Sequence, residues 1–510
     1  MAATKTPTDL PRLAMLSALG WLALLICLTL WKLGGSFEYP LDDVYIHLAM
    51  ADSLLRGEYG INPGENASAA SSFLYPFLLA PFAVAPVERF APLALNAAGL
   101  AWACWLWGRL VQRAGLARPA ALLLAVAGPV LLNMPGVAFL GMEHSLHVAA
   151  TLAVLEGLWV SLETGRANAL LWVGVVMGPA LRIEGLAVSG AACLALALAR
   201  QWRLAMALGV AAFVPVVAFV GLLRAEGLSW LPGSVTVKME EMDGTGGVGH
   251  LAFNLAHLSG PPLLGLAIVL LIGALLGKQV LDDRARLVAV VCALVGLAHL
   301  LVGRVGWAFR YENYVLVLMA AAALPLIAGF GRNLVTAVAL SVLLLAWPAW
   351  IYRGNLWRYG PDSALALHLQ QGQMARFAQA FWRAPVAVND IGRVAWRNPD
   401  YVLDLWGLAS PQAYALRLAS RGEVGWADGL LQAHNVELAM VYPSLLGQAA
   451  GAGWVPLGDL VLDVPKGYLG YDRVRFFANG SGAAARARDA LAAFLPGLPH
   501  GASFLPAGAK

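Results

Sequence analysis

Hydrophobic residues gather in long runs over the first part of this chain, and the runs stop at Ile351. A helix needs about 20 apolar residues to cross a hydrocarbon core of roughly 30 Å, and such runs recur from Leu13 onward. Charged residues and Pro/Gly breaks divide them into about eleven spans, near residues 13–33, 90–110, 119–135, 143–161, 168–181, 185–200, 204–223, 254–276, 287–303, 313–330 and 333–351. The pattern predicts a polytopic α-helical membrane domain over residues 1–351.

From Tyr352 onward the apolar runs become short and alternate with polar residues. A helical pattern from Ala364 to Phe381 comes first. Five strand-like runs follow it, at Val386–Val388, Tyr401–Leu405, Leu438–Tyr442, Trp454–Leu462 and Arg473–Phe477. We therefore predict a carboxy-terminal α/β domain over residues 352–510.

The loop 34–89 separates the first two predicted spans. Its residues 44–55 place apolar side chains at helical spacing opposite His47, and Gly57 supplies a stop. Residues 72–86 are apolar but short and rich in proline, and counting them as a span would invert the charge bias of everything that follows. We predict helices that lie on the membrane surface at both places.

Composition and charge agree with a bilayer as the main solvent of this chain. Hydrophobic residues make up 60% and charged residues 13%, whereas soluble proteins carry about 25% charged residues. The first run is longer than a signal-peptide core and no small-residue cleavage pattern follows it, so we expect a retained anchor. The net charge of +4 is small and lies mainly at helix ends, so we predict membrane lipids as partners and no nucleic acid.

Basic residues alternate between loops in the way that fixes membrane orientation. With the amino terminus in the cytoplasm, nearly every short loop that is rich in arginine or lysine falls on the inside. An odd number of spans then places residues 352–510 outside, together with the loops 34–89 and 224–253. The unusual charged residues of the chain share this outer side.

Two adjacent carboxylates, Asp42 and Asp43, follow the first span at the outer boundary of the membrane. Such a pair could hold a raised pKa and act as a base, or bind a divalent cation such as Mg or Mn. The alternative is that Asp42 N-caps the helix that follows and Asp43 complements the helix dipole. Spacing alone does not decide between the two interpretations.

Four basic residues on the same side form a second candidate group, at Arg182, Lys238, Arg304 and Arg310. Cations from separate segments that converge on one face suit a phosphate or pyrophosphate group, and arginines that snorkel at helix ends are the alternative. Arg182 and Glu184 interrupt two apolar runs that are each barely long enough to cross the membrane. A charge pair at such a helix break indicates function.

A third group opens another span on this side, at Glu143, His144 and His147. His147 lies one turn beyond Glu143, which fits a polar face toward a cavity. A satisfied interfacial cluster fits the same spacing equally well.

Four segments match motifs of a known group in their order and spacing. Residues 41–48 (LDDVYIHL) resemble the first outer loop of bacterial glycosyltransferases with the GT-C fold. Residues 140–143 are similar to that group's G-L-E-T element, and residues 181–185 to its T-R-P-E-G element. Residues 231–238 are similar to its L-P-N-T-x-x-A-K loop.

The likeness extends into the carboxy-terminal domain. Residues 386–392 and 403–408 resemble the outer domain of the arabinofuranosyltransferase-like branch, which builds cell-wall arabinan in mycobacteria. Two departures leave the sugar open. Gly233-Ser234 stands where the group has Asn-Thr, and residues 66–72 replace an E-G-Y-T-S-P stretch.

The resemblance implies an enzyme of the bacterial inner membrane that moves a sugar from a polyprenyl phosphate to a glycan, lipid or protein acceptor, with inversion of the anomeric centre. Carried over to this sequence, Asp42 would deprotonate the acceptor hydroxyl, and Asp43 would orient it or bind a metal. Arg182 and Lys238 would hold the leaving phosphate. Further candidate site residues lie in the same motifs, at Tyr45, His47, Glu143, His144 and Glu184.

Two other functions remain open from the sequence. A transporter or lipid flippase would carry its polar residues near the bilayer midplane within broken helices, whereas the candidates here gather at the outer boundary. A binding or assembly subunit would recognise a glycan without chemistry. Substitution of the aspartate pair separates these alternatives, because only an enzyme would lose turnover.

Overall fold

The computed structural model describes residues 9–230, 232–233, 246–420 and 422–508. Within this part of the chain, nine helical segments are long and apolar enough to cross a membrane. They are α1 (Leu10–Lys32), α4 (Ala91–Arg113) with the turn η2 (Val87–Phe90) before it, α5 (Arg118–Leu131) with α6 (Met134–Phe139), α7 (His144–Thr164), α10 (Trp202–Ala225), α13 (Gly260–Leu276) with η3 (Gly277–Gln279), α14 (Asp283–Val302), α15 (Asn313–Phe330) and α16 (Leu334–Tyr352). The predicted polytopic helical fold is confirmed.

Two shorter apolar helices, α8 (Ala169–Leu181) and α9 (Gly185–Leu198), bring the apolar helices to the predicted number. At 1.5 Å per residue, a helix of 13 residues is about 20 Å long, which is less than the roughly 30 Å of a hydrocarbon core. They pack closely where they turn, because a Cβ at Gly185 would lie 2.3 Å from the carbonyl carbon of Gly178. The turn between them carries Arg182.

The outer loop 34–89 contains the helix α2 (Asp43–Leu55), followed by α3 (Leu74–Leu79) and η1 (Ala80–Phe82). The helical pattern at residues 44–55 is therefore confirmed. Its place at the membrane surface stays a prediction, and every residue of α2 from Val44 to Ala51 is buried, His47 included. A helix that is buried on all sides packs between other parts of the protein, and α2 contacts both α3 and α19 (Gly392–Ala395).

The carboxy-terminal domain is α/β, as predicted. Its six strands are β1 (Val386–Val388), β2 (Val402–Asp404), β3 (Leu438–Val441), β4 (Trp454–Leu462), β5 (Arg473–Asn479) and β6 (Ala502–Pro506). Its helices are α17 (Tyr359–Leu369), α18 (Gln371–Arg376), the π-helical turn η4 (Phe377–Trp382), α19, α20 (Pro411–Ala419), α21 (Asp428–Ala433), α22 (Pro443–Leu446) and α23 (Gly480–Phe494). The sequence located the first five strands, whereas it missed β6 and α23.

The strands form one mixed sheet in the order β2-β1-β3-β5-β4-β6. The first three strands in this order are parallel, and the others run antiparallel. Successive side chains of a strand point to opposite faces, so Val386 and Val388 pack with the main core while Ala387 packs with a second cluster beside α20 and α21. Because β1, β2 and β3 are parallel, their carboxyl ends lie at the same edge of the sheet. Asn389, Trp406 and Tyr442 follow the strands at this edge.

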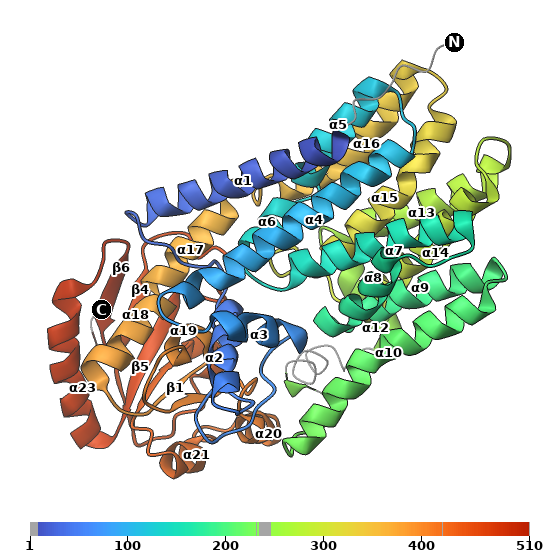
Figure 1. Ribbon diagram of the computed structural model, residues 1–510. Coiled ribbons are helices and arrows are strands. Elements are labelled where there is room, and N and C mark those ends of the chain that lie inside the picture. Colours follow the sequence, from blue (N-terminus) through green and yellow to red (C-terminus); the bar gives the residue numbers. More distant parts are fainter. Residues whose placement is uncertain (1–8, 231, 234–245, 421, 509–510) are drawn as a thin grey trace.

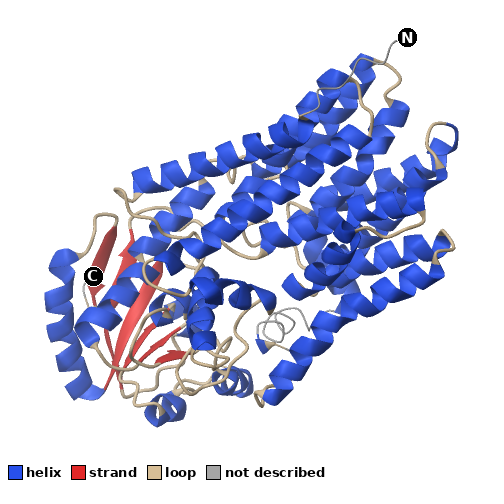
Figure 2. Ribbon diagram, in the orientation of Figure 1, coloured by secondary structure: helices blue, strands red, loops and turns tan. Residues whose placement is uncertain are grey.

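The two parts of the chain lie end to end. Figure 1 shows the long helices extending away from the sheet, with α23 on the far side of the sheet and α2 between the sheet and the long helices. Figure 2 shows that the strands are confined to this one end. The remaining described helix in the membrane domain, α12 (Gly246–Ala256), packs on α14. The outer loop is thus enclosed between the apolar helices and the carboxy-terminal domain.

Candidate active site

Asp42 lies at the N-cap position of α2, but its side chain makes no capping hydrogen bond to that helix. Its carboxylate reaches α19 in the carboxy-terminal domain. There Oδ2 accepts a hydrogen bond from the backbone N–H of Gly392 at 2.7 Å, and Oδ1 accepts one from the N–H of Arg393 at 2.8 Å. The interpretation of Asp42 as the side-chain cap of α2 is therefore wrong, because the carboxylate caps a helix 350 residues away along the chain.

The surroundings of Asp42 raise its pKa well above the usual range. Burial is the main cause, and the negative charge of Asp390 adds to it. The two backbone N–H groups act in the opposite direction, because they stabilise the carboxylate. Asp390 itself has a raised pKa for the same main reason, although Tyr442 donates a hydrogen bond to its Oδ2 at 2.7 Å and Gln371 donates another at 2.8 Å.

Asp43 has a different partner from Asp42. Its Oδ2 accepts a hydrogen bond from Nη2 of Arg310 at 2.5 Å, which also forms an ion pair. The same Nη2 atom contacts the hydroxyl of Tyr311 at 3.1 Å. The Arg310 side chain is buried, yet its Nε and Nη1 atoms have no hydrogen-bond partner among the residues that the structure describes. Buried donors without a partner are rare and call for an explanation.

Arg310 follows a backbone segment with an unusual conformation. Gly306, Trp307, Ala308 and Phe309 all have positive φ, at 92°, 42°, 62° and 56°. Each non-glycine residue in this region costs of order 1–3 kcal/mol, so the surrounding structure must hold the segment in place. Glu312 does so, because its Oε2 accepts the N–H of Gly306 at 2.9 Å and its Oε1 accepts the hydroxyl of Ser259 at 2.7 Å.

A cavity of about 390 Å³ lies between the membrane domain and the carboxy-terminal domain. Asp42, Asp43, Arg304 and Arg310 line it from the membrane domain. Asp390, Trp406 and Tyr442 line it from the edge at which the parallel strands end, the edge where α/β proteins bind their ligands. The structure thus brings together four of the residues that the sequence singled out.

A second group of predicted residues forms a separate ionic cluster. Nη1 of Arg182 lies 2.7 Å from Oε1 of Glu143, and Nη2 lies 2.7 Å from Oε1 of Glu184. Nε2 of His47 lies 3.6 Å from the other oxygen of Glu143, and His144 lies within hydrogen-bond distance of Arg182. Arg182 does not line the cavity. The charge of Arg182 is offset by these two carboxylates. Its guanidinium carbon lies 5.4 Å from the ring centre of Tyr311, a residue that lines the cavity.

Lys238 lies outside the described residues. Tyr45 is buried, and its hydroxyl donates a hydrogen bond to Glu38. This hydroxyl is therefore not offered to a substrate in the cavity. His147 is buried against the ring of Tyr314. These placements separate the predicted residues into a cavity group and a supporting group.

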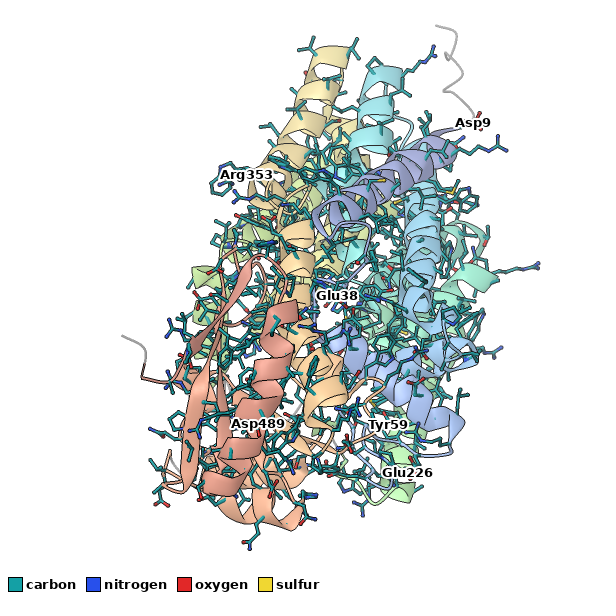
Figure 3. All side chains as sticks on the ribbon, turned by 90° about the vertical axis from the view of Figure 1, so that its left-hand side faces the viewer. Asp9, Glu38, Tyr59, Glu226, Arg353 and Asp489 are labelled. Carbon is teal, nitrogen blue, oxygen red and sulfur yellow. The ribbon has the colours of Figure 1, made fainter. Side chains whose placement is uncertain are left out.

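Glu38 is a residue that the sequence did not single out. It is buried in the middle of the molecule (Figure 3), with Arg89 and Arg393 each at 3.3 Å and His368 at 3.5 Å. Burial alone would raise its pKa, but the hydrogen bond with His368 and the charges of Arg393 and Arg89 outweigh burial and lower the pKa to about 2. Its partners come from three distant parts of the chain, so no local pattern could have revealed it.

Both carboxylates of the acid pair are engaged by groups of the protein. Both oxygens of Asp42 accept backbone N–H groups, and Asp43 is paired with Arg310. Among the described residues, no group of three or more His, Cys, Asp or Glu side chains is placed to hold a metal ion. A divalent cation at Asp42 and Asp43 stays a prediction of the sequence.

Comparison with known proteins bears on the fold. The family described as "Domain of unknown function (DUF8728)" matches residues 363–482, and no curated protein matches the sequence. Among solved structures, the oligosaccharyltransferase of Archaeoglobus fulgidus, in complex with Zn and sulfate, is 12% identical with a TM-score of 0.52, and the match covers 97% of this chain and 75% of that chain. The chain has the GT-C fold.

Two other solved structures are similar over most of this chain. ArnT from Cupriavidus metallidurans, bound to undecaprenyl phosphate, is 12% identical with a TM-score of 0.45, and the match covers 92% of this chain and 98% of that one. The arabinofuranosyltransferase AftD from mycobacteria is 17% identical with a TM-score of 0.48, and the match covers 94% of this chain and 42% of that one. The oligosaccharyltransferase match, together with the apolar helices and the sheet, confirms the predicted fold, a polytopic GT-C membrane domain with a carboxy-terminal α/β domain.

Proposed function

We propose that this chain is an inverting glycosyltransferase, which moves a sugar from a polyprenyl-phosphate donor to an acceptor at the outer face of a bacterial inner membrane. The sugar is an arabinofuranosyl or another pentosyl or hexosyl residue, and the acceptor is a cell-envelope glycan, lipid or protein. The observation that carries the proposal is a single cavity lined by a carboxylate with a raised pKa, Asp42, and by a buried arginine with unpaired donors, Arg310.

Sugar transfer requires a group that accepts the proton of the acceptor hydroxyl and a group that stabilises the negative charge of the leaving phosphate. The cavity residues supply both. The acceptor hydroxyl oxygen attacks the anomeric carbon, and Asp42 takes the hydroxyl proton. The bond between the anomeric carbon and the phosphate oxygen breaks, and its electron pair stays on the polyprenyl phosphate, whose charge changes from about −1 to about −2. Unpaired donors on Arg310 stabilise the new charge, with Arg304 on the same cavity wall.

The electrostatic surroundings favour Asp42 over Asp43 as the base. Asp43 forms an ion pair with Arg310, so its Oδ2 is already engaged by a guanidinium. Asp42 forms no ion pair with a described residue and faces the charge of Asp390. A base works best when its pKa lies near the working pH, and a raised carboxylate pKa moves Asp42 in that direction.

The flippase alternative is less consistent with the position of the cavity. Transporters bind their substrates near the bilayer midplane between broken helices. This cavity lies where the apolar helices meet the carboxy-terminal domain, and that domain supplies much of its wall. A charged cavity that lies next to apolar helices suits a substrate with a sugar phosphate and a prenyl chain.

The experiment that tests the proposal is a transfer assay with the purified chain in detergent. Polyprenyl phosphates bearing arabinofuranosyl, other pentosyl or hexosyl groups are offered one at a time with cell-envelope glycans, lipids and proteins. We expect one donor to release free polyprenyl phosphate and to give a glycosylated product. Movement of lipid-linked sugars across vesicle membranes without cleavage of any donor would contradict the proposal and establish the flippase.

A further inference from the structure

The contact between the two domains centres on the group that the proposed function makes the base. Both oxygens of Asp42 are held by consecutive backbone N–H groups of the carboxy-terminal domain, at 2.7 Å from Gly392 and 2.8 Å from Arg393. No side chain of that domain is needed for these two bonds. A carboxylate held at both oxygens has a fixed position and orientation, which a base needs in order to meet its proton.

Gly392 is suited to this contact because it has no side chain. A Cβ at this position would lie 2.2 Å from the backbone oxygen of Asp42 and 2.8 Å from its Oδ2. Real Cβ atoms do not approach other atoms this closely, and the first of these neighbours is backbone. Only close approach demands glycine here, because Gly392 is not among the residues with positive φ.

Neighbouring contacts keep the turn at Gly392 against the outer loop. The Arg393 side chain lies 3.3 Å from Glu38 and stands over the ring of Tyr45 at 5.3 Å. Asn62 pairs with the edge strand β2, because its Nδ2 donates to the oxygen of Val402 at 3.0 Å and its Oδ1 accepts the N–H of Val402 at 3.0 Å. The hydroxyl of Tyr401 donates to Glu65 at 2.9 Å. The outer loop is thus fastened to the domain at several points along its length.

We propose that the carboxy-terminal domain positions the base: the turn formed by Gly392 and Arg393 fixes the carboxylate of Asp42, and Gly392 is the positioning residue whose lack of a side chain permits it. This inference rests on the proposed function and extends it to the domain that matches a family of unknown function. The domain is then part of the catalytic apparatus, and its role is distinct from binding an acceptor.

The test is the substitution Gly392→Ala with Gly429→Ala as its matched control. Gly429 lies in α21 of the same domain, and a Cβ there would meet nothing within 4 Å. Misplacing a reacting group by about 1 Å can lower a rate by roughly 10²-fold. We therefore expect Gly392→Ala to lower kcat by about that factor, with an unchanged KM for the donor and unchanged binding of undecaprenyl phosphate, while Gly429→Ala behaves as the wild type.

A double-mutant cycle shows whether Gly392 acts through Asp42. In an Asp42→Asn background, Gly392→Ala should cause no further loss of rate, because the group that it displaces is already absent. A loss that adds fully to that of Asp42→Asn would overturn the inference. A rate for Gly392→Ala equal to that of the wild type would also overturn it, whereas a wild type without any transfer activity would refute the proposed function instead.

A second pair of variants covers the case in which Gly392→Ala does not fold. Arg393→Pro removes the N–H that Oδ1 of Asp42 accepts, and proline is tolerated in the first turn of a helix. Arg393→Ala keeps this N–H and removes the same ion pair with Glu38. We expect the proline variant to be slower than the alanine variant by roughly tenfold or more, as for a lost hydrogen bond to a charged group. Equal rates for the two variants would overturn the inference.

Discussion

Asp42 and Asp43 are adjacent in the chain, yet their carboxylates have different partners. Asp43 faces the guanidinium of Arg310, whereas Asp42 faces the carboxylate of Asp390 and two backbone N–H groups. A neighbouring negative charge disfavours ionisation and a neighbouring positive charge favours it. In the proposed reaction the two residues therefore have two roles, Asp42 as the base and Asp43 as the partner of the arginine that would hold the phosphate.

The charge of Asp390 should be visible in the pH dependence of turnover. A base is active when deprotonated, so activity is lost as the pH falls through the raised pKa of Asp42. Asp390→Asn removes one of the two negative charges that face Asp42, the other being Asp43. We expect the acid limb of kcat against pH to move to lower pH in this variant.

The control for this shift is Asp489→Asn, which changes the net charge equally. Asp489 lies on α23 (Figure 3), which is on the opposite side of the sheet from α2 (Figure 1). This variant should leave the pH profile unchanged. An acid limb that does not move in Asp390→Asn, or that moves to higher pH, would show that Asp390 does not act on the base.

The roles of the buried residues Arg310 and Arg182 can be distinguished by whether a substitution lowers ligand affinity or stability. Arg310→Gln removes the unpaired donors in the cavity, and charge-assisted hydrogen bonds are worth about 1.5–3 kcal/mol. We expect undecaprenyl phosphate to bind roughly 10- to 100-fold more weakly to this variant, as measured by titration in detergent.

Arg182→Gln should harm stability instead of binding. It leaves Glu143 and Glu184 without their cation, and the loss of one partner of a buried ion pair costs roughly 3–5 kcal/mol. The thermal midpoint should fall, while the folded protein keeps its affinity for undecaprenyl phosphate. Lost affinity at unchanged stability would return Arg182 to the phosphate site, where the sequence motif placed it.

At the scale of elements, patterns along the sequence predicted the helices and strands whose formation depends on neighbouring residues. Strands β1 to β5 and helix α2 follow from alternation and helical spacing, and the acid pair follows from its place after α1. The environment of α2 could not be predicted, because its polar His47 meets Glu143 from another helix and is buried. A helix that is amphipathic in sequence can therefore be enclosed on both faces when polar partners come from elsewhere.

Three residues of the site region, Asp390, Gly392 and Glu38, were not singled out from the sequence, and the physical reason is the same for each. Gly392 and Glu38 each contact a segment hundreds of residues away, and Asp390 faces Asp42 across the boundary between the two domains. Spacing along a sequence reports neighbours on one helix or strand, and it does not report which turn of a distant domain a carboxylate will meet. The motif at residues 386–392 was recognised by resemblance, whereas its contact with Asp42 required the structure.

At the scale of the whole molecule, the cavity requires the outer loop and the carboxy-terminal domain to share one side of the membrane. Nine long apolar helices are described, and counting α8 and α9 as two crossings or as a pair that turns back leaves the number of crossings odd. We therefore expect a reporter fused after Arg332 to be cytoplasmic and one fused at Lys510 to be outside. Two cytoplasmic reporters would place the cavity on the wrong side for a donor in the outer leaflet.

The central claim is that Asp42 is the base of a sugar transfer, and one variant tests it most directly. Asp42→Asn has nearly the same volume and keeps one acceptor oxygen for the two N–H groups of the turn at Gly392. The lost hydrogen bond costs about 1–3 kcal/mol, so the protein should stay folded with a lower thermal midpoint, as unfolding in detergent will show. Transfer from the polyprenyl-phosphate donor should fall by about 10²–10⁴-fold, the contribution of a general base. A stable Asp42→Asn protein with near-wild-type turnover would contradict the account.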